Sequence, residues 1–167
     1  MKKTVKTNAM RLLDKAKIAY EVYTYDIDIK DFNGEKVSEE IGLAKESCFK
    51  TLSLKSDHDL YILCIPVAKT LDLKKSAKNL GVKHLEMIKV KDLLKEVGYE
   101  RGSTSPIGII KKHHVCFDSD VLNYEEIEIS GGQFGISLKL KRDELLNYLK
   151  ADVQELCEVK NDEDNFI

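Results

Sequence analysis

The alternation of apolar and polar positions predicts short helices and strands from the start of the chain. Thr7 is placed to cap a helix that starts at the next residue, where apolar residues recur at helical spacing. The apolar and aromatic run 18–25 predicts a strand. A polar loop at 26–34 and a short helix at 35–41, ended by Gly42, follow it. Helix and strand therefore alternate early.

The central part of the chain has the pattern of a hairpin followed by two helices. Strand-like runs at 48–54 and 60–67 flank the turn-forming residues 56–59, and Lys50 lies within the first run. Two amphipathic helices are predicted next, each ended by a glycine: 72–80 before Gly81 and 89–97 before Gly98.

The last third of the chain contains a long loop and then mostly strands. Residues 99–108 carry too many loop-forming residues for regular structure. The remaining elements are strands at 115–118, 125–130 and 136–140, a glycine-rich turn at 131–135, a helix at 141–150 and a strand at 153–159. The pattern as a whole predicts a mixed α/β fold with many antiparallel pairings.

Length and composition indicate one globular domain. The chain has 167 residues, 43% hydrophobic and 34% charged, which suits a single domain at 1–159 and an acidic tail at 160–167. The net charge of −2 argues against a large basic surface for nucleic acid, so no DNA partner is expected, although a small contact with an RNA end is compatible with it. No apolar run approaches the roughly 20 residues that cross a bilayer. We expect no membrane partner and a cytoplasmic location.

The cysteines and histidines give no sign of a metal site. Cys48, Cys64, Cys116 and Cys157 are scattered without a CxxC pair, which favours reduced thiols. His113 and His114 are adjacent, and because neighbours on a strand point to opposite faces, they are poorly placed to bind one metal ion. We expect neither a metal nor a cofactor.

The chain lacks the motifs of several large enzyme classes. There is no GxSxG elbow, P-loop, HExxH motif or dinucleotide-binding glycine fingerprint, so no protein nucleophile is indicated. Lys50 either lies in solvent on its strand or points into a pocket as a fixed positive charge. Tyr25, at a strand end, either binds a ligand through its hydroxyl or is a half-buried strand residue.

Two glycine-containing loops are the remaining candidates for chemistry. Backbone N–H groups in such loops can approach a phosphate or a developing oxyanion closely. Each loop taken alone is equally compatible with an ordinary turn. The candidate binding residues are Gly102, Ser105, Pro106 and Gly108 in the first loop and Ser130, Gly131, Gly132 and Gly135 in the second.

An ordered set of motifs resembles the YbaK family of bacterial aminoacyl-tRNA deacylases, which is related to the editing domain inserted in bacterial prolyl-tRNA synthetase. The resemblance covers about 7–159. Its motifs are Arg11-Leu12-Leu13-Asp14-Lys15-Ala16, Phe49-Lys50-Thr51-Leu52, Leu73-Lys74-Lys75-Ser76-Ala77-Lys78, Gly81-Val82-Lys83, Ser105-Pro106-Ile107-Gly108, and Ser130-Gly131-Gly132 followed by Gly135. It implies a single domain with a largely antiparallel, barrel-like mixed sheet surrounded by helices.

The resemblance also implies an activity. Family members hydrolyse the ester of cysteine mischarged onto proline tRNA, often beside prolyl-tRNA synthetase, and the substrate's own thiol is proposed to attack the ester. Lys50 matches the family's essential lysine, while Tyr25, Gly102 and Ser130 match pocket positions. The family usually has glycine at position 103 and often arginine at position 134. Ser103 is expected to narrow the pocket, and Phe134 to remove a phosphate contact.

Two other functions remain open at this point. One is a related deacylase that removes alanine or another small amino acid from proline tRNA, with water as the attacking group. The other is a module that binds tRNA or a synthetase without catalysis, in which Lys50 would contribute to affinity alone. In each case the expected partner is the 3′ end of a tRNA or a synthetase.

Overall fold

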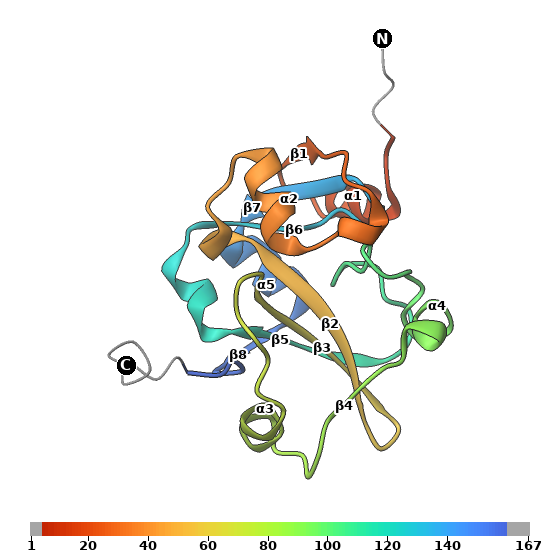
Figure 1. Ribbon diagram of the computed structural model, residues 1–167, viewed down its shortest axis with the longest axis vertical. Coiled ribbons are helices and arrows are strands. Elements are labelled where there is room, and N and C mark those ends of the chain that lie inside the picture. The colour runs from red at the N-terminus through yellow and green to blue at the C-terminus, as the bar shows by residue number, and fades with distance from the viewer. Residues whose placement is uncertain (1–4, 160–167) are drawn as a thin grey trace.

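The computed structural model describes residues 5–159 of the chain (Figure 1). The helices in this part are α1 (Asn8–Lys15), α2 (Gly34–Ile41), α3 (Leu73–Leu80), α4 (Leu93–Val97) and α5 (Arg142–Leu149). The strands are β1 (Tyr20–Thr24), β2 (Phe49–Ser56), β3 (Asp59–Pro66), β4 (Glu86–Met87), β5 (His113–Asp118), β6 (Glu126–Ser130), β7 (Ile136–Lys141) and β8 (Asp152–Gln154). The expected acidic tail at 160–167 lies outside the described residues.

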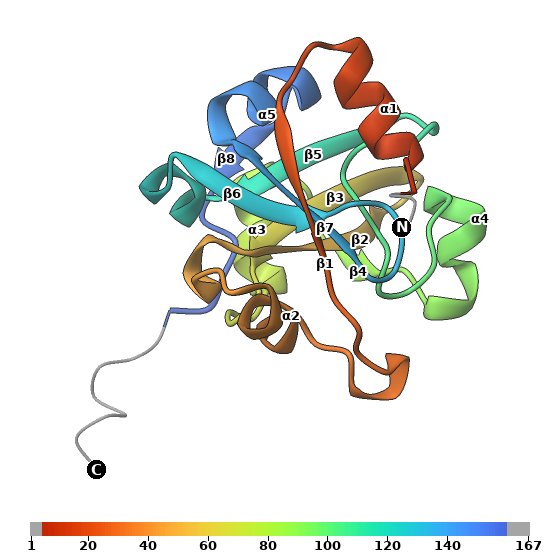
Figure 2. The same cartoon turned by 90° about the horizontal axis from the view of Figure 1, so that it is seen from above.

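The strands form two sheets that lie across one another (Figure 2). The three-stranded sheet, in the order β1-β7-β6, is antiparallel throughout. The five-stranded sheet, in the order β4-β2-β3-β5-β8, is mixed, because β3 pairs with β5 and β5 with β8 in parallel. An isolated bridge between Cys48 and Glu128 connects the sheets. The mixed α/β fold is confirmed, although the strands of the described region do not close into a barrel.

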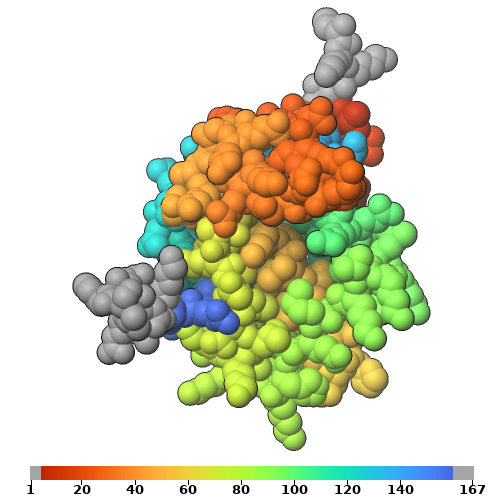
Figure 3. All heavy atoms as spheres, in the orientation of Figure 1, coloured from red at the N-terminus to blue at the C-terminus, as the bar shows by residue number. Residues whose placement is uncertain are grey.

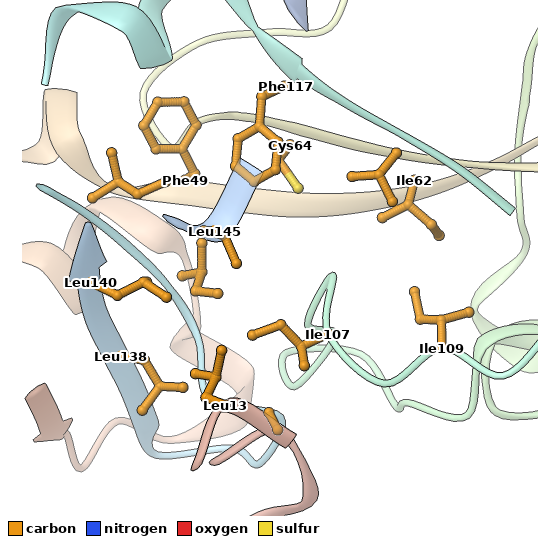
Figure 4. Packing of buried hydrophobic residues seen from close by; sticks show 14 of the residues in the cluster. Leu13, Phe49, Ile62, Cys64, Ile107, Ile109, Phe117, Leu138, Leu140 and Leu145 are labelled. Carbon is orange, nitrogen blue, oxygen red and sulfur yellow. The ribbon is translucent and has the colours of Figure 1, made fainter. Parts of the chain in front are cut away.

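The main core fills the space between the two sheets. Strand alternation sends Ile127 and Ile129 of β6 toward Ile62 and Cys64 of β3 in one buried cluster. Figure 4 shows further members of this cluster converging from both sheets and from the loop before β5: Phe49, Ile107, Phe117, Leu138 and Leu140. Each such side chain contributes about 1.5–3 kcal/mol when fully buried. This burial fixes how the sheets cross.

A second core lies on the opposite face of the five-stranded sheet. Leu63 and Ile65 of β3 pack there with Ala77 of α3 and with Leu156. Strand β3 is therefore covered on both faces, which explains why its sequence is a nearly continuous apolar run. Strands β2 and β3 contribute residues to both cores, which fixes their position between them.

Most elements agree with the sequence pattern. The Thr7 hydroxyl accepts a hydrogen bond from the Met10 N–H (3.2 Å) and starts α1 as predicted. Gly42, Gly81 and Gly98 end their helices in the left-handed conformation. The predicted hairpin is present as β2 and β3.

Two predicted elements are shorter than expected. In the predicted helix 89–97, residues 90–92 form a 3₁₀ turn and only Leu93–Val97 is α-helical, with no side chain capping the start of either part. The predicted strand 153–159 is β8, which ends at Gln154. The chain turns there because the Leu156 N–H donates to Asp118 and the Leu156 carbonyl accepts from Asp72.

Candidate active site

Lys50 lies on an edge of β2 that remains uncovered. Strand β3 pairs along the whole of β2, whereas β4 pairs only with Leu54 and Lys55. The Ser53 carbonyl accepts from the Ile88 N–H (3.0 Å), and among the described strands none pairs with the second edge of residues 50–52. A strand edge without a neighbour exposes backbone N–H and C=O groups that a ligand can use. Lys50 and this edge form one wall of a cavity.

The cavity has a volume of about 810 Å³, within the usual size range of ligand sites. Figure 3 shows part of β2 between the α2 segment and the green segment near residue 100, where the surface is hollowed. Besides β2, most of its walls come from four parts of the chain: the start of α2 (33–37 with Glu39), residues 87–93, the loop residues Arg101, Gly102 and Thr104, and the polar face of β6 and β7. Tyr25, Phe32 and Val67 complete the lining.

Lys50 supplies a partly desolvated positive charge to this cavity. Burial lowers the pKa of its ammonium group, while Cys157 and Glu35 act in the opposite direction. None of the ion pairs within 5–159 includes Lys50. A cation without a protein carboxylate at 4 Å is available for an anionic or strongly polar ligand group.

Glu128 supplies a buried carboxyl group to the same cavity. It lies on β6, whose neighbours Ile127 and Ile129 point into the main core, so that Glu128 points to the other face of the sheet. Its exposed fraction is 5%. Burial raises the pKa of Glu128 to about 7, although hydrogen bonding with Ser137 and Cys48 works in the opposite direction. The cavity thus contains groups of opposite charge character.

The first glycine loop reaches the cavity only with its leading part. Gly102 has a φ of +86°, and a Cβ there would lie 3.1 Å from the Phe134 ring and 3.3 Å from Ile29. Both its backbone conformation and its close contacts therefore favour glycine. The neighbouring Ser103 hydroxyl donates to the Glu100 carbonyl (2.9 Å), and Ser103 is absent from the cavity lining. The expected narrowing by Ser103 finds no support in this arrangement.

Ser130 connects the two glycine loops. Its hydroxyl donates to the Ser103 carbonyl (3.0 Å) and accepts from the Gly132 N–H (3.2 Å). Ser130 also lines the cavity, beside Ser137 of β7. One side chain therefore fixes the loop that carries Gly102 against the end of β6.

Three aromatic rings pack together beside Gly102. The ring centroid of Phe134 lies 5.7 Å from that of Tyr25 and 5.4 Å from that of Phe32. The Tyr25 N–H donates to the Gly135 carbonyl (2.9 Å), which holds Tyr25 at the end of β1. Tyr25 and Phe32 line the cavity. The position where the family often has arginine is here part of an apolar rim.

The structure gathers four of the ten predicted site residues around one cavity: Tyr25, Lys50, Gly102 and Ser130. Six others lie outside its lining: Ser105, Pro106, Gly108, Gly131, Gly132 and Gly135. Ser105 and Pro106 are buried, and the Ser105 hydroxyl accepts from the Ile107 N–H (3.2 Å). Their role in substrate binding stays a prediction.

Sequence reasoning missed Glu128, Phe32, Thr51 and Arg101 as cavity residues. In the sequence 125–130, acidic and apolar residues alternate, which is the pattern of a strand with one face in solvent. Alternation assigns Glu128 to a face but does not reveal that another element covers that face. The signal for Glu128 was therefore absent from its local sequence.

Within 5–159, no three or more His, Cys, Asp or Glu side chains gather where they could hold a metal ion. No helix of this region has the length and apolar character to span a bilayer. All four cysteines are buried and unpaired.

Comparison with known proteins identifies the family. The family model described as the aminoacyl-tRNA editing domain matches residues 29–148, which include Lys50, Gly102, Glu128 and Ser130. The chain belongs to the aminoacyl-tRNA editing domain family. Every lining residue of the cavity except Tyr25 therefore lies within the matched part of the chain.

Individual relatives agree with this assignment. A protein of Enterococcus faecalis that is provisionally named Cys-tRNA(Pro)/Cys-tRNA(Cys) deacylase EbsC is 34% identical over 152 residues, covering 90% of this chain and 93% of that protein. A solved structure described provisionally as a trans-editing enzyme for prolyl tRNA synthetase superposes with a TM-score of 0.78 at 19% identity, covering 93% of this chain and 100% of that one. A scaffold protein from epitope grafting gives a TM-score of 0.80 at 20% identity, covering 91% and 96%. At such identities the two structures show the shared fold.

Proposed function

We propose that this editing domain is a trans-editing hydrolase that releases cysteine from mischarged proline tRNA. The cavity that holds Lys50, Gly102 and Ser130 in an editing domain carries this proposal. The name of the 34% identical relative supports the choice of cysteine. A volume of about 810 Å³ accommodates an aminoacyl group together with the terminal adenosine.

The cavity is suited to position and polarise an ester. Lys50 supplies a partly desolvated cation that can stabilise negative charge on the carbonyl oxygen or hold the phosphate of the terminal nucleotide. The backbone around Gly102 provides a close approach without a Cβ atom. The rings of Tyr25 and Phe32 offer apolar surface on which a nucleobase can stack.

The substrate provides the nucleophile in this proposal. The cysteine thiol loses its proton, the sulfur attacks the ester carbonyl, and the bond from the carbonyl carbon to the ribose oxygen breaks. The ribose oxygen takes up a proton and leaves with the tRNA. Cysteine departs as a cyclic thioester, which water then opens. The enzyme contributes orientation and electrostatic stabilisation.

Prolyl-tRNA synthetase is the partner that this proposal implies. The net charge of −2 gives the chain little general attraction for tRNA, so delivery by a synthetase would compensate for weak binding. We expect the isolated protein to bind tRNA weakly and with strong salt dependence. Nanomolar affinity at physiological salt without a partner would contradict this view.

The test is the release of labelled amino acid from a panel of tRNAs charged with cysteine, alanine or proline. The proposal predicts rapid release from cysteinyl-tRNA(Pro) and slow release from alanyl-tRNA(Pro), because alanine has no thiol. Preference for the alanyl substrate would indicate the water-dependent deacylase instead. Binding without release of any amino acid would indicate a non-catalytic module.

A further inference from the structure

Glu128 is a buried carboxyl group without a cationic partner in the described structure. It lines the cavity, its exposed fraction is 5%, and no Lys, Arg or His nitrogen of residues 5–159 lies within 4.0 Å of its oxygens. Removing a carboxylate from water without such a partner is costly, and buried charges in proteins are usually paired. The carboxyl group is therefore unlike an ordinary core residue.

The cation opposite Glu128 in the sheet is directed elsewhere. The register of β6 and β7 places Lys139 directly across from Glu128. The Lys139 ammonium instead lies 3.5 Å from a carboxylate oxygen of Glu21 and 5.8 Å from the centre of the Tyr23 ring. The register would allow Lys139 to form a cross-strand ion pair with Glu128, but the structure does not contain this pair. Glu128 remains turned toward the cavity.

The surroundings of Glu128 stabilise it without neutralising it. Hydrogen bonding with Ser137 and Cys48 favours the carboxylate, but burial dominates and raises the pKa of Glu128 to about 7. A ligand that carries a positive charge would complete this environment and favour the ionised carboxylate. The group that Glu128 lacks within the described structure is a cationic hydrogen-bond donor.

Lys50 and Glu128 both line the cavity but do not form an ion pair. None of the ion pairs within 5–159 joins them, so the Lys50 nitrogen and the Glu128 oxygens lie more than 4.0 Å apart. Neither charge is therefore neutralised by direct contact with the other. A ligand with a negative or carbonyl end and a positive end would match this separation of charges.

We propose that Glu128 binds the α-ammonium group of the aminoacyl ester, while Lys50 faces the ester or the adjoining nucleotide. This inference rests on the proposed function. Every aminoacyl ester has this amino group whatever its side chain, so Glu128 would recognise the substrate class. The other carboxylates of the lining, Glu35 and Glu39, are exposed, and Glu35 already faces Lys45 at 3.9 Å. Exposed carboxylates discriminate weakly, because solvent screens them.

Calorimetry with two stable analogues tests this assignment. One is 3′-(L-cysteinyl)amino-3′-deoxyadenosine, in which an amide replaces the ester at the 3′ position, and the other is the same molecule without the α-amino group, 3′-(3-mercaptopropionyl)amino-3′-deoxyadenosine. The wild-type protein is expected to bind the amine at least about tenfold more tightly, as is typical of a hydrogen bond to a charged group. Glu128→Gln should reduce this preference to about one.

Glu126→Gln provides the matched control, because Glu126 lies two residues away on the same strand and is exposed. It should retain the wild-type preference. Equal binding of the two analogues by the wild-type protein would overturn the inference and leave the proposed function intact. Failure of the wild-type protein to bind either analogue would contradict both. An unchanged preference in folded Glu128→Gln would assign the ammonium to another group.

Discussion

The loop at 99–108 contains two neighbouring parts, 101–104 and 105–108, with different surroundings. The first part places Gly102 and Thr104 on the cavity. The second part buries Ser105 and Ile107 in the molecule, and Ile107 belongs to the main core between the sheets. Tyr99 closes the loop by donating a hydrogen bond from its hydroxyl to the Ile107 carbonyl. One short segment thus contains both a binding surface and the anchor that holds it.

This difference separates two roles of residues that share one motif. Residues of the cavity are expected to govern activity, while they contribute little to the free energy of unfolding or even lower it. Residues of the anchor are expected to govern stability, and activity only through the position of the cavity. The same division applies to the second loop, where Ser130 lines the cavity and Gly132 packs beside Tyr99. Substitutions on the two sides should therefore differ mainly in their effect on activity.

The largest expected effect is on the cavity side, at Lys50. Lys50→Ala removes the unpaired cation and should slow deacylation by about 10²–10³-fold, the usual cost of losing one electrostatic contact to a reacting group. Single-turnover release of labelled cysteine measures the rate. Lys55→Ala is the control, because Lys55 lies on the same strand but pairs with Glu96 outside the cavity. Wild-type turnover by Lys50→Ala would remove its assigned role.

The second prediction concerns stability at Glu128. Because burial raises its pKa above the value of about 4.5 expected in the unfolded chain, to about 7, its ionisation opposes folding. The penalty is absent below about pH 4.5, grows as the pH rises and is complete above about pH 7. Glu128→Gln should therefore stabilise the protein at pH 8 by roughly 3 kcal/mol. Denaturant unfolding of both proteins at pH 4.5 and pH 8 provides the comparison. An equal difference at both pH values would contradict this explanation.

The third prediction compares the two glycines of the first loop. Gly108 has a φ of +87°, and a Cβ there would lie 3.2 Å from the Tyr99 hydroxyl and the Asn8 side chain. Gly108→Ala should lower the free energy of unfolding by about 1–2 kcal/mol, because L-residues disfavour this conformation. The folded enzyme should stay active.

Gly102→Ala is the counterpart on the cavity side. Gly102 has nearly the same φ, +86°, so the cost in stability should be similar. Its added methyl group faces the aromatic rim, and deacylation should fall as well. Thermal melts and deacylation rates of the two variants measure the contrast. Equal losses of activity would show that the loop acts as one unit.

The smallest effect is expected at Ser130. Ser130→Ala breaks two hydrogen bonds between the loops, to the Ser103 carbonyl and the Gly132 N–H. We expect a loss of about 1 kcal/mol in stability with a partial loss of activity, because both sides of the division depend on this side chain. Ser130→Thr, which retains the hydroxyl, should recover most of the stability. If Ser130→Thr recovered neither stability nor activity, the connecting role of the hydroxyl would be contradicted.

The sequence was informative where local physics determines the structure. The Thr7 cap, the glycine helix ends and the hairpin are each determined by neighbouring residues and were predicted correctly. The end of β8 was not, because contacts of Leu156 with Asp118 and Asp72 end the strand, and those residues are distant in sequence. Boundaries that tertiary contacts decide are not encoded in the local pattern.

The site residues also differ in how far the sequence reveals them. Lys50 was identified because its motif matches the family's essential lysine, whereas its position on a strand left its role open. Glu128 belongs to a regular alternation and was not identified, because its burial results from packing against parts of the chain distant in sequence. The glycine loops were recognised as special, but their composition does not tell which end faces a ligand and which end the core.

The central question is where the aminoacyl end of the substrate binds. A crystal structure of the protein with 3′-(L-cysteinyl)amino-3′-deoxyadenosine would locate it. We predict that the analogue lies along the uncovered edge of β2, with its amino group at Glu128 and its adenine beside Tyr25 and Phe32. Binding instead at the smaller hollow lined by Lys74, Lys78 and His84, with the cavity empty, would contradict the central claim.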